Sequence, residues 1–256
     1  MEPAEYDVMA AAEDSLWWYR GLRRLVIETL EWAFPRGGPE RIVDVGCGTG
    51  GCYVVVRDRF PTVRYVGIDP EPKAIAYCRA RGLRDVIRAS ASEIPLRCGS
   101  ADAVICLDVL YYPSVRPAAA MRDFYEVLKP GGVLILNLPA FESLRGQHDV
   151  AVTIPKRYRL REARSLCEGA GFRIARATYW NATFFLPLVV WRRLSRSKRD
   201  AIAHSDVDRS PPWLNALFHW VLSLELGALR WVALPFGSSA FVVARKPSRA
   251  SCGLAC

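Results

Sequence analysis

The stretch Arg41–Gly50, with the sequence RIVDVGCGTG, decides the fold. Its short apolar run passes directly into closely spaced glycines, which indicates a buried parallel strand that enters a tight turn. The turn predicts a helix over Gly51–Asp58, whose free N–H groups face the same point. A second apolar strand, in Tyr65–Asp69, ends on a carboxylate placed to accept hydrogen bonds from two ribose hydroxyls. Strand, glycine turn, helix, strand and acid together predict a nucleoside-binding crevice.

The spacing of the glycines indicates which nucleoside. A dinucleotide fingerprint is G-x-G-x-x-G, whereas Gly46, Gly48 and Gly50 give G-x-G-x-G. Asp44, inside the strand end, would repel a pyrophosphate but suits a ligand that carries an ammonium or a sulfonium. The pattern D-x-G-x-G-x-G, followed by an acidic end of the second strand, resembles the class I S-adenosylmethionine (SAM)-dependent methyltransferases. The alternative is a Rossmann-like turn that binds NAD or no nucleotide.

This resemblance implies SAM as the cofactor and gives each part of it a place. It puts the amino acid part at Asp44 and the glycine turn, the ribose at Asp69, and the adenine edge at the SASEIPL segment that begins at Ser90. The end of the fourth strand would line the methionine side. The expected cofactor-binding residues are Trp18, Arg20, Asp44, Gly46, Cys47, Gly48, Gly50, Asp69, Pro70, Ser90, Ala91, Leu107 and Asp108.

Composition sets the class of protein. The 256 residues can bury one core, and half of them are hydrophobic, which predicts a globular chain. The net charge is +9, but the 30 arginines and 5 lysines are spread along the chain, so nucleic-acid binding is not required. The eight cysteines contain no C-x-x-C pair, so we expect neither a metal site nor disulfides. The acidic start lacks a signal-peptide pattern, and we expect a cytoplasmic, reduced protein.

A first helix is expected over Leu16–Phe34, capped by Asp14 or Ser15. It begins with WWYRGLRR, which resembles the WWFRGRR-type opening of a bacterial branch of the same family. The resemblance implies a lid in which Trp18 shields the sulfonium and Arg20 meets a carboxylate. The alternative is an ordinary amphipathic helix whose aromatic residues belong to the core.

The rest of the chain alternates strands and helices. We expect helices over Pro70–Arg81, Ala118–Leu128 and Leu160–Ala170, and strands over Asp85–Arg88, Ala101–Leu107, Val133–Leu138, Phe172–Tyr179 and Ser239–Arg245. The segment FYEVLKPGGVLIL resembles the family's hallmark segment between its fourth and fifth strands. The alternation predicts an α/β fold, a doubly wound, Rossmann-like sheet of seven strands.

One domain is expected, with five parts. They are an N-terminal helical cap (14–38), a SAM-binding core (39–180), a helical insertion (181–237), the last strand (238–246) and a flexible tail (247–256). The insertion holds apolar helices near Ala182–Leu194 and over Trp213–Val232, which we interpret as a cover beside the crevice. Peripheral membrane contact through Trp191 and its neighbouring arginines Arg192, Arg193 and Arg196 is the alternative.

The acceptor side is indicated by aromatic residues. Where relatives often read D-V-L-E-H, this chain has Tyr111 and Tyr112 in place of the last two residues. His148, next to Asp149, is the candidate general base, and the alternative is that it only fixes a loop. The expected acceptor-binding residues are Tyr19, Tyr111, Tyr112, Phe141, His148 and Tyr158.

The sequence therefore predicts methyl transfer to a C, N or O nucleophile of a small, aromatic metabolite, without nucleic acid as a partner. Three alternatives stay open. They are a methyltransferase of a glycan or lipid-linked intermediate at the membrane surface, a nucleic-acid methyltransferase, and a non-catalytic SAM-binding module. No N-P-P-Y tetrapeptide follows the fourth strand, which disfavours the second. The sequence does not decide whether the chain forms a homodimer.

Overall fold

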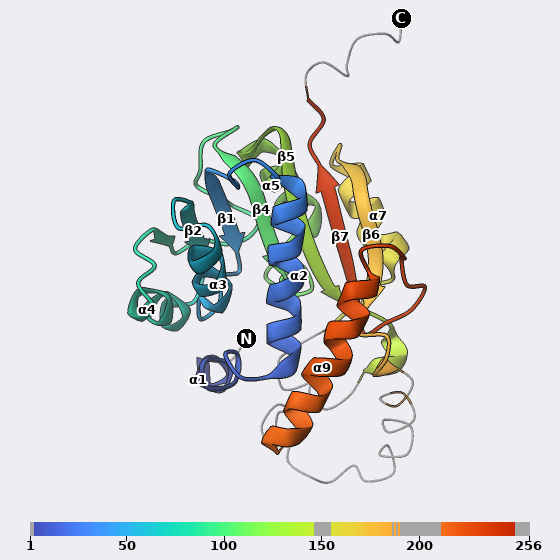
Figure 1. Ribbon diagram of the computed structural model, residues 1–256. Helices are drawn as coiled ribbons and strands as arrows, with labels where there is room; N and C mark the ends of the chain where they lie inside the picture. Colours follow the sequence, from blue (N-terminus) through green and yellow to red (C-terminus); the bar gives the residue numbers. More distant parts are fainter. Residues whose placement is uncertain (1–2, 146–154, 186, 188, 190–210, 249–256) are drawn as a thin grey trace, which may run out of the picture.

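The computed structural model describes residues 3–145, 155–185, 187, 189 and 211–248, and its centre is a seven-stranded sheet (Figure 1). The strand order is β3-β2-β1-β4-β5-β7-β6. The strands are β1 (Arg41–Val45), β2 (Arg64–Ile68), β3 (Val86–Ile87), β4 (Ala101–Leu107), β5 (Leu128–Pro139), β6 (Arg173–Trp180) and β7 (Ser239–Arg245).

Helices cover both faces of the sheet. They are α1 (Pro3–Ala12), α2 (Trp17–Ala33), α3 (Gly51–Arg59), α4 (Pro72–Ala80), α5 (Pro117–Val127), the 3₁₀ turn η1 (Glu142–Leu144), α7 (Leu160–Gly169) and α9 (Pro212–Ala228). Apolar residues of α2, α3 and α9 pack on one face, and those of α5 and α7 pack on the other. Figure 1 shows α2 and α9 side by side across the front of the sheet, with α1 to the left of the lower end of α2, where α2 begins.

Strands β1 to β5 are parallel, and β7 runs antiparallel between β5 and β6. The carboxyl ends of β1, β2, β4 and β5 therefore meet at one edge of the sheet, which is where ligands bind in open α/β folds. The predicted fold class is confirmed, and the bounds of β4 and β7 are the expected ones.

Two local expectations need correction. β5 begins at Leu128 instead of Val133, because Leu128 already pairs with Ala101 of β4. The register of the two strands is irregular between this pair and Val133, where Gly131 and Gly132 lie. Asp14 and Ser15 do not cap α2, whose first turn has Leu16 as its N-cap without a side-chain hydrogen bond. Asp14 instead forms ion pairs with Arg23 and Arg81.

Helix α1 was not anticipated from the sequence. Its start carries ordinary helix signals, a proline in the first position and Glu5 in the first turn. The helix expected near Ala182–Leu194 and its basic neighbours lie mostly outside the described residues, as do residues 249–256 of the expected tail. Among the described residues, no helix is long and apolar enough to cross a membrane.

Candidate functional site

The glycine turn after β1 has the backbone that its sequence predicts. Gly46, Gly48 and Gly50 all have positive φ, at 75°, 53° and 83°. A Cβ at Gly46 would lie 2.2 Å from a methyl carbon of Val109, so a larger residue is excluded both by conformation and by space. The turn leads directly into α3, whose N-terminal N–H groups lie at this edge of the sheet.

Asp69 follows β2 at the same edge and is held by three donors. Its carboxylate accepts hydrogen bonds from the backbone N–H groups of Gly48 and Glu71, both at 3.0 Å, and from the Tyr6 hydroxyl at 3.3 Å. The side chain is buried, and burial raises the pKa of the carboxyl above its ordinary value despite these donors. Helix α1 thus places a hydroxyl on the carboxylate for which the sequence predicts ribose hydroxyls.

A second contact ties the end of α1 to the glycine turn. The Glu13 carboxylate accepts from the Thr49 hydroxyl at 2.5 Å and forms ion pairs with Arg81 at 2.7 Å and Arg23 at 3.5 Å. A Cβ at Gly51 would lie 2.2 Å from Glu13 Oε2, so this carboxylate sits directly at the start of α3. Burial raises the pKa of Glu13, which the two guanidinium groups oppose.

Sequence reasoning missed this cluster. It named Arg20 as the arginine of the WWYRGLRR segment that faces the cofactor, but the structure places Arg20 on an exposed side of α2. The arginine that α2 directs at the glycine turn is Arg23, three residues later. One helical turn separates the two positions, and the partner that fixes Arg23 belongs to the unanticipated α1 segment.

The remaining residues that we expect to bind the cofactor lie along the same edge. Asp44 is buried and accepts a 2.6 Å hydrogen bond from Tyr65, and burial raises its pKa to about 7. The Cys47 and Cys78 sulfur atoms are 3.7 Å apart beneath the turn. Ser90 accepts from the Ser92 N–H, Ala91 is buried, Leu107 is half-buried and Pro70 is exposed.

Asp108 differs from Asp69 in its surroundings. It follows β4 with a φ of 58°, a conformation that costs energy for a residue other than glycine. Its carboxylate accepts a 2.9 Å hydrogen bond from the Asn137 amide, whose oxygen in turn accepts from the Trp180 indole at 2.8 Å. Desolvation raises the pKa of Asp108 to about 7, although Asn137 and Arg157 oppose the shift. The side chain is nevertheless partly open to solvent.

The strain at Asp108 is not isolated. Among the described residues, the other non-glycine positions with positive φ are Phe141 and Asn181, both at 57°. These residues follow β5 and β6, which end at the same edge of the sheet as β4. Strained backbone of this kind clusters at functional sites, so the strained residues after β4, β5 and β6 indicate a functional site at this edge of the sheet.

Aromatic side chains surround Asp108. Tyr19, Tyr111 and Tyr112 lie close enough for their electrostatic interactions with Asp108 to contribute to their raised pKa values, of which burial is the main cause. The rings of Tyr111 and Tyr112 are 4.6 Å apart, and Trp18 stacks on Trp180 at 5.7 Å.

Other expected residues have different places. Phe141 packs against the rings of Tyr179 and Phe185 at 4.9 and 5.1 Å. Tyr158 is buried and its hydroxyl donates to the Leu110 carbonyl, so its polar group is already used. His148 and Asp149 lie outside the described residues. Within the described ranges, no cluster of three or more histidine, cysteine or acidic side chains could hold a metal ion.

Comparison with known proteins agrees with this geometry. A family profile described as "Methyltransferase domain" matches residues 43–136, the segment from β1 into β5. The chain is 29% identical over 122 residues to a trans-aconitate 2-methyltransferase of Deinococcus radiodurans, which covers 48% of this chain and 46% of that protein. It is 34% identical over 123 residues to a demethylmenaquinone methyltransferase of Thermus thermophilus, covering 46% and 53%. The chain thus spans about half the length of these curated relatives.

Solved structures share the fold over a longer range. A structure described as the [4+2]-cyclase SpnF superimposes with a TM-score of 0.59 and 22% identity, covering 90% of this chain and 83% of that one. At this identity the likeness concerns the fold alone. The fold is therefore shared by proteins with different reactions, and the reaction must be argued from the site.

Proposed function

We propose that the chain is a class I SAM-dependent methyltransferase that transfers a methyl group from SAM to a small acceptor molecule, as the match of residues 43–136 to a methyltransferase domain supports. The observation that carries the proposal is the shared edge of the sheet. There, a glycine turn, the start of α3 and the buried carboxylate of Asp69 lie together, next to Asp108 and its aromatic neighbours.

The residues present fit SAM better than a dinucleotide. Asp69 and Glu13 both act electrostatically on Asp44, and Asp108 adds a fourth carboxyl at the same edge. Such an acidic crevice favours a ligand with an ammonium and a sulfonium and disfavours a pyrophosphate. When bound, SAM supplies a methyl group whose carbon is already electrophilic because it is attached to the sulfonium.

The binding roles follow from position. Asp69 would accept from the ribose hydroxyls, the glycine turn would hold the amino acid part, and Ser90 and Ala91 would flank the adenine. Glu13, tied to Thr49 and to two arginines, would close the end of the crevice near α3. Since the reaction is an in-line displacement, the chain's main tasks are to align the acceptor and to exclude water.

Asp108 is our candidate for the general base where the acceptor must lose a proton. A base works best when its pKa is near the working pH, and the pKa of about 7 meets that condition. The Asn137 amide and the Trp180 indole form a chain of hydrogen bonds that fixes the orientation of the carboxylate. The strained φ of 58° holds the side chain at the strand end. His148 remains the prediction from sequence, and the two candidates are separable by mutation.

The acceptor would bind among Trp18, Tyr19, Tyr111 and Tyr112. Flat apolar or cationic molecules pack well against such rings, which supports an aromatic acceptor. One relative is named for trans-aconitate and another for demethylmenaquinone, so these names support small molecules as a class without choosing one.

The proposal is tested by incubating the full chain with SAM labelled in its methyl group and a panel of aromatic metabolites. We expect label in at least one acceptor and equal amounts of S-adenosylhomocysteine. SAM binding without transfer to any acceptor would favour the non-catalytic binding module.

A second candidate is an acceptor attached to a lipid. The observation that favours it is the exposed apolar face of α9, which lies beside the α2 helix of the same crevice. Lipid-linked acceptors therefore belong in the same panel.

A further inference from the structure

Helix α9 exposes large apolar side chains in a single row. Trp213 is 69% exposed, Leu217 45%, Trp220 60% and Leu224 58%. Their spacing of four, three and four residues places them on one face of the helix. We refer to these four residues as the α9 face. Isolated exposed apolar residues are ordinary, but a row with two tryptophans marks an interaction surface.

The opposite side of α9 is fixed against the protein. Leu222 and Leu226 are buried, and a Cβ at Gly21 of α2 would lie 2.3 Å from Leu222 Cδ2. The glycine of the WWYRGLRR segment thus allows a close crossing of the two helices. Asn215 adds hydrogen bonds of 2.8 Å to the Trp17 N–H and to the Ser15 carbonyl. Rotation of α9 to bury its outer face would break this packing.

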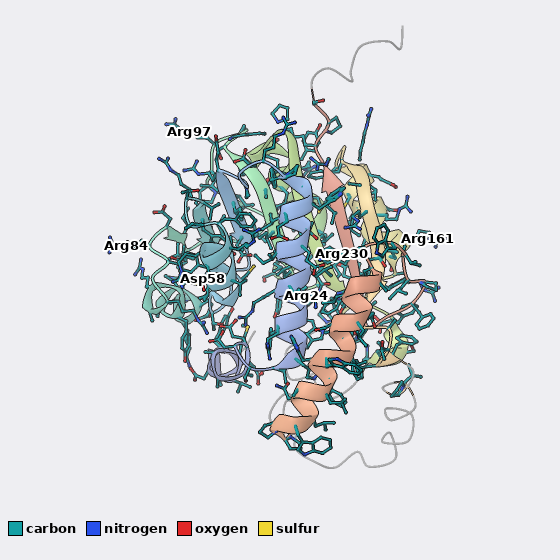
Figure 2. The ribbon with its side chains drawn as sticks, viewed as in Figure 1. Arg24, Asp58, Arg84, Arg97, Arg161 and Arg230 are labelled. Atoms are coloured by element: carbon teal, nitrogen blue, oxygen red, sulfur yellow. The ribbon has the colours of Figure 1, made fainter. Side chains whose placement is uncertain are left out.

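The charges near the α9 face are mainly positive. Arg20 and Arg24 of α2 act on His219 of α9, whose pKa is lowered by burial first and by these two cations next. Figure 2 labels Arg24 on α2 and Arg230 just beyond the end of α9. The acid of α9, Glu225, accepts from the backbone N–H groups of Ala182 and Thr183, so its charge is directed at the protein. Arg24 and Arg230 share Glu28, which leaves an excess of positive charge.

We propose that the α9 face docks the protein on an anionic phospholipid surface, with Trp213, Leu217, Trp220 and Leu224 entering the headgroup region and Arg20 facing the lipid phosphates. Amphipathic helices that lie in a membrane interface combine a tryptophan- and leucine-rich face with neighbouring basic residues, as this one does. Tryptophan suits the interface because its ring is apolar and its N–H is polar.

The charge also argues against a second copy of the chain as the occupant. A symmetric dimer through this face would bring two copies of the same basic residues into one contact, in a protein whose net charge is already +9. Like charges in such a contact oppose association, whereas anionic lipid attracts them. This inference does not depend on methyl transfer and goes beyond the proposed function.

Co-sedimentation of the full chain with phospholipid vesicles tests the proposal. We expect binding to vesicles of phosphatidylcholine with phosphatidylglycerol, weaker binding when salt is added, and little binding to phosphatidylcholine alone. The double variant Trp213→Ser/Trp220→Ser should lose about tenfold or more of its partitioning into anionic vesicles. Arg20→Gln should weaken binding to anionic vesicles only.

The matched control is Trp32→Ser. Trp32 is also exposed, but its ring contacts the guanidinium groups of Arg176 and Arg245 and is not part of the α9 face. Thermal unfolding checks that each variant is folded. Failure of the wild type to bind anionic vesicles, or equal binding by the double tryptophan variant, would overturn the proposal. A dimer in sedimentation velocity that this double variant converts to monomer, without vesicle binding, would overturn it in favour of a subunit interface.

Discussion

Asp69 follows β2 and Asp108 follows β4, so both lie at the same edge of the sheet, but their surroundings differ. Asp69 accepts two backbone N–H groups and a tyrosine hydroxyl, and its backbone is unstrained. Asp108 has the amide of Asn137 as its close donor and a strained backbone, and its pKa is raised to about 7. Burial raises the pKa of Asp69 as well, but its three donors favour the ionised carboxylate, which is suited to binding. A carboxylate with few donors takes up a proton readily and is suited to proton transfer.

A mutation of Asp108 tests the difference between the two aspartates most directly. We expect Asp108→Asn to lower kcat by about 10²–10⁴-fold, the usual contribution of a general base, while the affinity for S-adenosylhomocysteine changes little. Steady-state kinetics and calorimetry on the same preparation measure the two quantities. The exposed Asp58→Asn on α3, a position labelled in Figure 2, is the matched control and should leave both unchanged. Full activity in Asp108→Asn, or a lower kcat in His148→Ala alone, would assign the base to His148.

The pH dependence of the free energy of unfolding gives a second test of the raised pKa of Asp108. The native pKa of Asp108 is about 7 against 3.8 ordinarily, so the native state binds more protons than the unfolded state between these values. The contribution of Asp108 to the free energy of unfolding is therefore complete below its ordinary pKa of 3.8 and is lost as the pH rises toward 7. Over the same range kcat rises, because the base becomes ionised. Asp44 and Glu13, with raised pKa values, act in the same direction on stability.

Denaturant unfolding between about pH 5 and pH 7 measures this slope. In this window, acids with lowered pKa values such as Asp14 and Glu28 are already ionised and contribute little. We expect a shallower slope in Asp108→Asn than in the wild type. Identical slopes would show that Asp108 is ionised throughout and would remove the argument for proton transfer.

At Asp69 the expected effect is on binding. Asp69→Ala should weaken S-adenosylhomocysteine binding by about 1.5–3 kcal/mol, the value of hydrogen bonds to a charged group, with the protein still folded. Isothermal calorimetry gives the affinity, and circular dichroism checks the fold. Unchanged affinity would place the ribose elsewhere.

The smallest expected effect concerns Tyr6. Its hydroxyl donates to buried Asp69, and Tyr6→Phe should lower the free energy of unfolding by about 1 kcal/mol. Tyr53→Phe is the control, because the Tyr53 hydroxyl makes a bond of the same 3.3 Å length to the Gly82 carbonyl but at the surface. Equal losses in the two variants would mean that α1 adds nothing specific to the cofactor edge.

The sequence predicted the parts of this site that depend on local pattern. The apolar strands, the glycine turn and Asp69 lie within about thirty residues, and each has a recognisable period or spacing. The doubly wound sheet of seven strands followed from the alternation of strands and helices and from the family resemblance.

What the sequence could not predict depends on contacts between distant segments. Glu13 meets Thr49 and Arg81 across 36 and 68 residues, and nothing in the acidic start indicates those partners. The choice of Arg23 over Arg20 depends on which face of α2 packs on the sheet. The raised pKa of Asp108 follows from its desolvation in the folded chain, which no local pattern encodes.

The central claim is that the glycine turn and Asp69 form a SAM site, and calorimetry on the wild-type chain tests it most directly. S-adenosylhomocysteine and NAD are titrated in parallel into the same folded protein. The account predicts micromolar binding of S-adenosylhomocysteine and no heat from NAD. A folded protein that binds NAD, or that binds neither ligand, would contradict it.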